Sequence, residues 1–271
     1  MNLNLALITH GPGGIRRVAS QNLPQVPGVS YIVSWQNHEN TPVPDSLAHR
    51  PDIFIHRFDT TGQSLNRNNS LELCTADIIL IADDDLKYTP EALLNVISTF
   101  EEHPEVDLAT FRSINDCKTA YPRESVKLKS HLPRNYSVST YEMAIRRKTA
   151  GALRFHPELG LASPSLHGGE DEAFLLTAIK RGLHCRFFPL TLCVHDHPST
   201  GSKAHPTDAN IRAAGCIIAL YNPWTAVLRL PLKALRLHRS KRANFFRALP
   251  LLISGALRTP RLFRRGKEYL W

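Results

Sequence analysis

The sequence predicts an α/β protein with a doubly wound sheet, followed by a basic helical extension. Two observations carry this prediction: short apolar runs without strict alternation, and segments of helical apolar spacing that separate them. The former suit strands buried on both faces, as in a sheet covered by helices. Strand alternating with helix is the pattern of a doubly wound sheet, and 271 residues suffice for one large domain with an appendage.

Four buried strands are expected in the first part of the chain, each rich in Ile, Val or Leu. They are Leu3–Thr9, Val29–Trp35, Asp52–His56 and Asp77–Ala82. The clearest helix follows the fourth strand, at Thr89–Glu102. Thr89 can cap this helix, Pro90 fits its first turn, and an apolar stripe runs along one face.

Three consecutive carboxylates, Asp83, Asp84 and Asp85, follow the fourth strand directly. Ligands of open α/β sheets bind beyond the carboxyl ends of the strands, which is where these residues lie. A turn and a helix cap explain one aspartate but not three. A cluster of carboxylate oxygens suits Mg²⁺ or Mn²⁺, which proteins usually share with substrate phosphates. We therefore expect a divalent-cation site here.

A polar helix is expected just before these acids, at about residues 64–75. Arg67 lies in it and can hold an anionic group in a bidentate fork. With Gly62, the start of this helix could face a phosphate. A helix start that merely faces solvent is the alternative. The helix also contains three poor helix formers, namely Asn66, Asn68 and Asn69.

Acids also open a later helix, where Glu170, Asp171 and Glu172 follow Gly168 and Gly169. The helix dipole favours acids in a first turn, so a purely structural role is one interpretation. The same dipole keeps a carboxylate ionised, as a general base requires. The two glycines would let a substrate approach closely. We favour a catalytic role for this segment.

Two histidines, His195 and His197, flank an aspartate after the apolar stretch RFFPLTLCV. In an extended segment, alternate side chains share one face. The pair could supply a metal ligand or contact phosphates, and His197 is slightly preferred to His195. A structural role for either is the alternative.

The series GQSLNRNNSLELCTADIILIADDD, GGEDEAF and HDHPSTG resembles the family 2 glycosyltransferases of the GT-A fold over roughly residues 1–205. The resemblance implies a GT-A type mixed, Rossmann-like sheet, with residues 1–111 as the nucleotide-sugar-binding half and 112–220 as the acceptor and catalytic half. Residues 221–271 are then an extension.

The resemblance also implies roles for individual residues. The Asp-x-Asp pair is Asp83 and Asp85, with Asp85 the preferred metal ligand and Asp84 a further contact to the donor. Asp171 is the catalytic base, paired with Glu170. The remaining positions are expected in the nucleotide or diphosphate site: Arg67, Asn68, Gly62 and either histidine, with Thr9, Ser34 and Gln36 as base or ribose contacts.

Two loops depart from the family pattern. The first strand ends in ITHGPG instead of the usual Pro-Thr-Tyr-Asn. The second ends in VSWQN, where many members have Asp-Asp-Gly-Ser. These loops commonly contact the base, so uracil, thymine and guanine all stay open.

The net charge of +9 belongs to the end of the chain. Residues 221–271 hold 12 of the 33 Lys and Arg residues but a single acid, Glu268. Leucines and aromatic residues alternate with this charge, which suits an anionic membrane surface. Nucleic acid also rewards positive charge, but the segment is richer in Leu than is usual for RNA binding, so we expect no nucleic-acid partner. A solvated helical face is the third interpretation.

The predicted function is transfer of a sugar from a nucleoside-diphosphate sugar to a glycan or polyprenyl-linked acceptor, in bacterial cell-surface polysaccharide synthesis. Two alternatives stay open. HGPGGIRR (residues 10–17) faintly resembles the loop of a nucleotidyltransferase, and a non-catalytic, membrane-associated glycan-binding module is the other. Five cysteines without CxxC spacing indicate reduced thiols, so we expect a cytoplasmic protein, peripheral on the inner face of the membrane.

Overall fold

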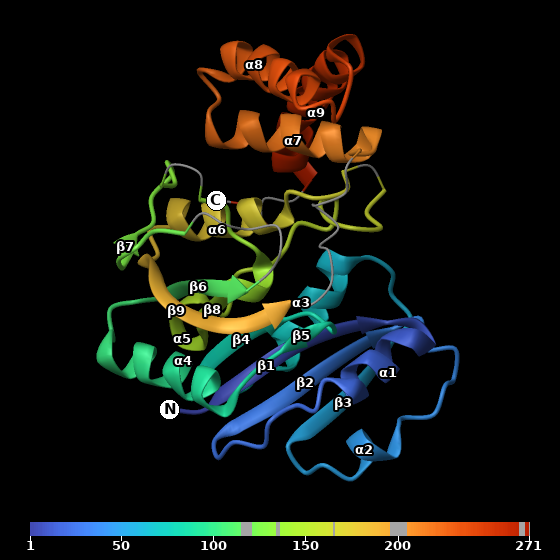
Figure 1. The fold of residues 1–271 in the computed structure, drawn as a ribbon, viewed down its shortest axis with the longest axis vertical. Helices are drawn as coiled ribbons and strands as arrows, with labels where there is room; N and C mark the ends of the chain where they lie inside the picture. Colours follow the sequence, from blue (N-terminus) through green and yellow to red (C-terminus); the bar gives the residue numbers. More distant parts are fainter. Residues whose placement is uncertain (115–120, 134–135, 165, 196–204, 266–268, 271) are drawn as a thin grey trace.

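The computed structural model describes residues 1–114, 121–133, 136–164, 166–195, 205–265 and 269–270 (Figure 1). Within these residues a mixed sheet has the strand order β3-β2-β1-β4-β8-β6-β9-β5, and β7 pairs with β9. The strands are β1 Leu3–His10, β2 Val29–Gln36, β3 Ile53–Phe58, β4 Ile78–Ala82, β5 Leu86–Lys87, β6 Leu108–Ile114, β7 Val126–Lys127, β8 Met143–Arg146 and β9 Cys185–His195.

The four predicted strands are confirmed as β1 to β4, each within two residues of its expected ends. They run parallel, so their carboxyl ends meet at one edge of the sheet: His10 pairs with Gln36, and Gln36 with Phe58. β8 is antiparallel to both β4 and β6, which makes the sheet mixed as the resemblance implies. The three aspartates emerge at this same edge.

Helices cover both faces of the sheet. In β1, Leu5 and Leu7 pack into the cluster that includes α1 and α4, and Ala6 packs into the cluster that includes α3 and α6. Thr89 Oγ1 accepts a hydrogen bond from Ala92 N at 3.1 Å, so the predicted cap of α4 is confirmed. The helices of the body are α1 Gly11–Ser20, α2 Asp45–Ala48, α3 Gln63–Leu73, α4 Pro90–Glu102, the 3₁₀ turn η1 Thr140–Glu142, α5 Arg147–Ala150 and α6 Glu170–Lys180.

The last part of the chain forms a helical layer beyond α6, drawn at the top of Figure 1. It contains α7 Asp208–Tyr221, α8 Ala226–Arg239 and α9 Phe245–Arg265, which share one apolar cluster. Two glycines allow α7 and α9 to touch backbone to backbone. A Cβ at Gly215 would lie 2.0 Å from Leu252 O, and one at Gly255 would lie 1.8 Å from Arg212 O.

The end of the chain returns to the helix that carries the acidic pair. Arg181, just after α6, donates a hydrogen bond from Nη2 to Leu270 O at 3.1 Å, and Leu262 and Leu270 pack with Leu176 of α6. The basic segment is therefore packed on the body over part of its length. Among the described residues, no helix combines the length and the apolar character needed to cross a membrane.

Candidate active site

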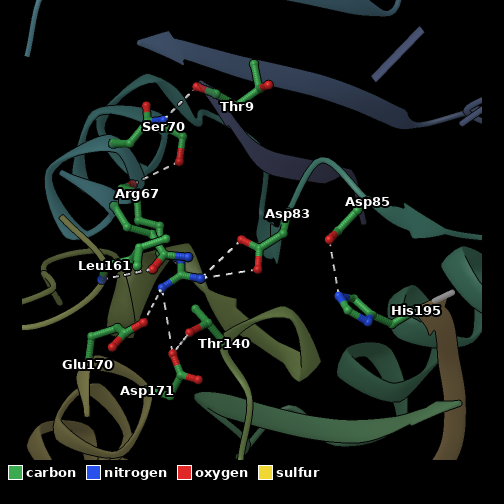
Figure 2. Close-up of polar contacts among 12 residues, drawn as sticks. Thr9, Arg67, Ser70, Asp83, Asp85, Thr140, Leu161, Glu170, Asp171 and His195 are labelled. Carbon is green, nitrogen blue, oxygen red and sulfur yellow. Dashed lines mark hydrogen bonds and ion pairs between the residues drawn. The ribbon is translucent and has the colours of Figure 1, made fainter. Parts of the chain in front are cut away.

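The three consecutive aspartates point to three different partners (Figure 2 shows two of them). Asp83 binds Arg67, with Nη2 3.1 Å from Oδ1 and 3.3 Å from Oδ2. Asp84 turns back toward the first strand, and Asp85 faces His195. The mutual repulsion of adjacent carboxylates is thus offset by a separate polar or cationic partner for each.

Asp84 is held by Thr9 and Arg17. Thr9 Oγ1 donates to Asp84 Oδ2 at 2.5 Å, and Arg17 donates from Nε at 3.1 Å and from Nη2 at 2.9 Å. Burial raises the pKa of Asp84, and both partners oppose that rise. Gly14 keeps the room for this contact, since a Cβ there would lie 2.1 Å from Thr9 Oγ1 and 2.9 Å from Asp84 Oδ2. Asp84 therefore joins the first strand to the acidic turn.

Asp85 and His195 form the pair best suited to a cation. Asp85 Oδ2 lies 3.3 Å from His195 Nε2, because β5 and β9 pair at Leu86 and His195. The His195 ring is buried and stacks on Tyr141 with centroids 5.5 Å apart. Its Nδ1 is buried and has no hydrogen-bond partner among the described residues.

The donor set of Asp85 and His195 fits a divalent cation. Carboxylate oxygen and imidazole nitrogen are ligands that Mn²⁺ accepts, and Mg²⁺ is commonly held by one or two protein groups plus substrate phosphates. In the described part of the chain, no group of three or more Asp, Glu, His or Cys side chains is placed to hold a metal. Any cation here would therefore take its remaining ligands from the donor and from water.

Arg67 occupies the centre of the site and is 2% exposed. Besides Asp83, its Nη1 lies 3.2 Å from Glu170 Oε1 and 3.7 Å from Asp171 Oδ1 (Figure 2). Burial alone would lower the pKa of Arg67, but the three carboxylates raise it above its ordinary range. One buried guanidinium thus fixes the acidic turn after β4 and the first turn of α6 relative to each other.

Asp171 lies in the first turn of α6, behind Gly169 at the N-cap with φ of 82°. The hydroxyl of Thr140 donates a hydrogen bond to Asp171 Oδ1. Burial raises the pKa of Asp171 well above its usual range, the charge of Glu170 adds to the rise, and Arg67 opposes it. A raised pKa makes the ionised carboxylate a stronger base than that of an ordinary aspartate.

Two cavities meet at Asp83. The first, of about 590 Å³, is lined by Thr9, Arg17, Gln36, Asp85 and His195 among others. The second, of about 270 Å³, is lined by Arg67, Glu170, Asp171 and Ser139 among others. Their common wall consists of four residues: Gln63, Asp83, Tyr141 and Leu161. We call them the donor cavity and the base cavity.

The structure brings most of the predicted site residues to these two cavities. Thr9, Gln36, Gly62, Asp83, Asp84, Asp85 and His195 line the donor cavity. Arg67, Glu170 and Asp171 line the base cavity, together with Asp83. His197 lies outside the described residues.

Two predicted contacts, Ser34 and Asn68, line neither cavity. Ser34 is fully buried and donates to Asn66 Oδ1 at 2.6 Å. The Asn68 amide binds the backbone of Phe155, with Nδ2 2.9 Å from its oxygen and Oδ1 2.7 Å from its nitrogen. Both side chains therefore support the walls of the site, because α3 has to anchor a strand on one side and the loop that follows α5 on the other.

Several site residues were not expected from the sequence. Asn66 joins the ends of two strands, since it accepts from Ser34 and donates to Thr9 O at 2.9 Å. Arg17 belongs to the HGPGGIRR segment, whose basic end was visible but had no assigned partner. Leu161 and Tyr141 carry no motif. Leu161 is held at the cavities by a hydrogen bond from its backbone N to Gln63 Oε1, and Tyr141 lies there as part of η1.

Comparison with known proteins gives a family match over part of the chain and a similar fold. Residues 44–169 match the family model described as glycosyl transferase family 2. The structure of S. aureus TarS 1-349 in complex with UDP-GlcNAc aligns with a TM-score of 0.58 and 14% identity, over 99% of this chain and 88% of that one. No curated protein sequence matches this chain.

Two further structures of TarS 1-349 give the same picture. The complex with UDP aligns with a TM-score of 0.59 and 15% identity, over 99% of this chain and 88% of that one. A third structure aligns with a TM-score of 0.59 and 14% identity, over 98% and 92%. Similarity at this level of identity shows the fold alone, and it confirms the predicted GT-A architecture.

Proposed function

We propose that this chain, whose residues 44–169 match the glycosyl transferase family 2 model, is a glycosyltransferase that moves a sugar from a nucleoside-diphosphate sugar to a glycan or lipid-linked acceptor, with inversion. The observation that carries this proposal is the pair of cavities that share Asp83. One contains a candidate cation site at Asp85 and His195, and the other contains a carboxylate of raised pKa, Asp171. A donor in the first cavity and an acceptor in the second could meet at Asp83, which lines both.

In the proposed reaction, the Asp171 carboxylate accepts the proton of an acceptor hydroxyl. The oxygen of that hydroxyl forms a bond to the anomeric carbon as the bond from this carbon to the diphosphate oxygen breaks. The nucleoside diphosphate departs with the bonding electron pair, on the face opposite the attack. Thr140 and Arg67 hold Oδ1 of the Asp171 carboxylate in position, and Asp171 lines the base cavity.

Asp85 and His195 would hold a Mn²⁺ or Mg²⁺ ion. When bound, such an ion supplies positive charge to the diphosphate and makes it a better leaving group. Asp83 is bound by Arg67 and Asp84 by Arg17, so these two carboxylates position the turn in the structure described above. Arg17 is half exposed and lines the donor cavity, where its guanidinium could also contact a phosphate.

Product analysis tests this function. UDP-GlcNAc is the first donor to try, since TarS structures hold UDP-GlcNAc or UDP. Release of a nucleoside diphosphate is expected, whereas release of pyrophosphate would indicate nucleotidyl transfer. Asp171→Asn should lower kcat by about 10²–10⁴-fold and leave nucleotide binding in place. Release of pyrophosphate, or full activity of Asp171→Asn, would contradict the proposal.

We also propose that the helical layer contacts an anionic membrane surface, at the inner face of the cytoplasmic membrane. Large apolar side chains are exposed there beside the basic residues: Trp224 at 94%, Phe246 at 83% and Leu257 at 75%. Burial of such side chains in a membrane interface is favourable. Because α9 packs backbone to backbone on α7, deletion of residues 221–271 would also uncover α7.

Substitution is therefore the better test of membrane contact. Trp224→Ser with Phe246→Ser should reduce cosedimentation with anionic liposomes, because both side chains are exposed on the helical layer. Phe54→Ser is the matched control, since Phe54 is 48% exposed on β3. Equal loss in the control, or no loss in the double variant, would count against a membrane surface at α8 and α9.

A further inference from the structure

A third cavity, of about 540 Å³, adjoins the base cavity and runs along the boundary between α7 and α8. It shares His167, Gly168, Gly169 and Asn210 with the base cavity, so the two form a continuous depression. The Asn210 amide donates to His167 O and thereby ties α7 to the loop before α6. We call this cavity the tail groove. Gly169 and Glu172, which flank the candidate base in the chain, line it, and it shares no lining residue with the donor cavity.

The wall of the tail groove on α8 is basic. Arg229, Leu232, Lys233 and Arg236 line it at spacing i, i+3, i+4 and i+7, which places them on one helical face. A second stripe of α8, Leu230, Ala234 and Leu237, is buried in the apolar cluster shared with α7 and α9. The leucines and the basic residues of α8 thus lie mainly on two different faces, one packed on neighbouring helices and one lining the groove.

Three cations and one carboxylate, Glu172, line the groove. Arg229 donates from Nε to Thr225 Oγ1 at 2.8 Å. Among the described residues, no ion pair joins Arg229, Lys233 or Arg236 to an acid. Burial and the charges of Arg242 and Arg236 lower the pKa of Lys233, while Glu172 raises it. The groove therefore has an excess of positive charge that a bound anion would offset.

The floor of the groove is apolar. Ile217 and Ile218 of α7 form it together with two alanines of the same helix and Leu232 of α8. A Cβ at Gly169 would lie 2.6 Å from Ile217 Cγ1, so the floor touches the N-cap of the helix that carries Asp171. Leu228, one turn before Leu232 on α8, is 67% exposed.

We propose that the tail groove holds the phosphate and the first hydrocarbon units of a lipid-linked acceptor. Arg229, Lys233 and Arg236 would bind the phosphate oxygens, since guanidinium and ammonium groups form charge-assisted hydrogen bonds to phosphate. Ile217, Ile218 and Leu232 would pack on the hydrocarbon chain. The sugar of the acceptor would then reach the base cavity through the shared wall at Gly168 and Gly169. This inference rests on the proposed function and assigns its acceptor class.

The test measures binding of farnesyl phosphate to the whole protein by titration calorimetry. Lys233→Met with Arg236→Ala removes two groove charges, and methionine keeps the length of the partly buried Lys233 side chain. We expect this variant to bind farnesyl phosphate at least about tenfold more weakly. Arg239→Ala is the matched control: it removes an exposed cation from the same helix outside the groove, and its affinity should stay within about twofold.

Two further ligands separate the parts of the acceptor. Inorganic phosphate carries the charge alone and farnesol the hydrocarbon alone, and each should bind at least about tenfold more weakly than farnesyl phosphate. Equal affinity of wild type and double variant, or inorganic phosphate as tight as farnesyl phosphate, would overturn the inference. The unfolding transition of the double variant is measured as well. If it is unchanged, a loss of binding is due to the groove and not to misfolding.

Nucleoside-diphosphate binding with Mn²⁺, measured on the same proteins, distinguishes two kinds of failure. If the wild type binds a nucleoside diphosphate, but wild type and double variant bind farnesyl phosphate with equal affinity, only the inference fails. If no nucleoside diphosphate binds, the proposed donor chemistry fails with it.

Discussion

Arg67 Nη2 lies 3.1 Å from Asp83 Oδ1, and this contact joins the two halves of the candidate site. The same guanidinium reaches the first turn of α6 from its other nitrogen, at Glu170. The acidic turn after β4 and the acidic start of α6 are far apart in the chain, yet one buried cation fixes the distance between them. A donor on one side and an acceptor on the other would depend on that distance.

Arg67→Ala should destabilise the protein by about 3–5 kcal/mol at neutral pH, because it leaves buried carboxylates without their cation. Arg67→Lys should restore part of this stability but little activity, since an ammonium cannot bind Asp83 and Glu170 in a fork. Denaturant unfolding and donor turnover measure the two effects. An alanine variant as stable as wild type would show that the ion pairs of Arg67 do not contribute to the free energy of unfolding.

Glu170→Gln should move the acid limb of the kcat/KM profile to lower pH. The pKa of Asp171 is raised by burial first and by the charge of Glu170 second. Removal of that charge lowers the pKa, so Asp171 becomes ionised, and able to accept a proton, at a lower pH than in wild type. Glu91→Gln, in the first turn of α4, is the control. A shift of the limb to higher pH would exclude Asp171 as the titrating base.

Arg17→Ala should cost on the order of 1 kcal/mol of stability at pH 7, since Arg17 is half exposed. Arg17 lowers the pKa of Asp84 and burial raises it, so loss of Arg17 raises the folded-state pKa further. The stability lost is therefore present above that pKa and disappears as the pH falls through the wild-type folded-state pKa of Asp84, which already lies above the ordinary aspartate value of about 3.9. Unfolding at several pH values tests this, with the exposed Arg16→Ala as control; a loss that is independent of pH would contradict it.

Gly215→Ala should destabilise the helical layer, because its Cβ would lie 2.0 Å from Leu252 O. A contact this short forces α7 and α9 apart, at a cost of about 1–3 kcal/mol or more. Gly13→Ala is the matched control: its nearest atom would be Arg17 Nη1 at 3.8 Å, so it should be neutral or slightly stabilising. Calorimetric melting measures both, and equal melting temperatures would show that α9 does not pack on α7 in solution.

The parallel half of the sheet could be predicted from the sequence because its strands are short, apolar and buried on both faces. β8 could not, since MAIR reads equally well as the continuation of a helix, and its place between β4 and β6 depends on pairing with both. The two-residue strands β5 and β7 both form by pairing with β9, so their own residues give no strand signal.

In the candidate site, too, the residues with a local sequence signal could be predicted and those placed by long-range contacts could not. The aspartates were visible because three carboxylates directly after a buried strand are more than a turn and a helix cap explain, and the α6 acids because they follow two glycines at a helix start. Asn68 was placed in the nucleotide site by resemblance, whereas its amide binds the backbone of Phe155. Such a long-range contact between a side chain and the backbone leaves no local signal. The tail groove was hidden for a similar reason: α8 reads as uniformly basic and leucine-rich until α9 covers one of its stripes.

The most direct test of the account is the thermal stability of the protein with UDP, dTDP, GDP, CDP or ADP, each with and without Mn²⁺, in wild type and in Asp85→Ala. A ligand at about 100 times its dissociation constant should stabilise the folded state by roughly 2.7 kcal/mol. The account predicts a shift for one diphosphate that needs both Mn²⁺ and Asp85, and that persists in Asp45→Ala, which changes an exposed aspartate. A shift that survives in Asp85→Ala, or the absence of a shift with every diphosphate, would contradict the donor site described here.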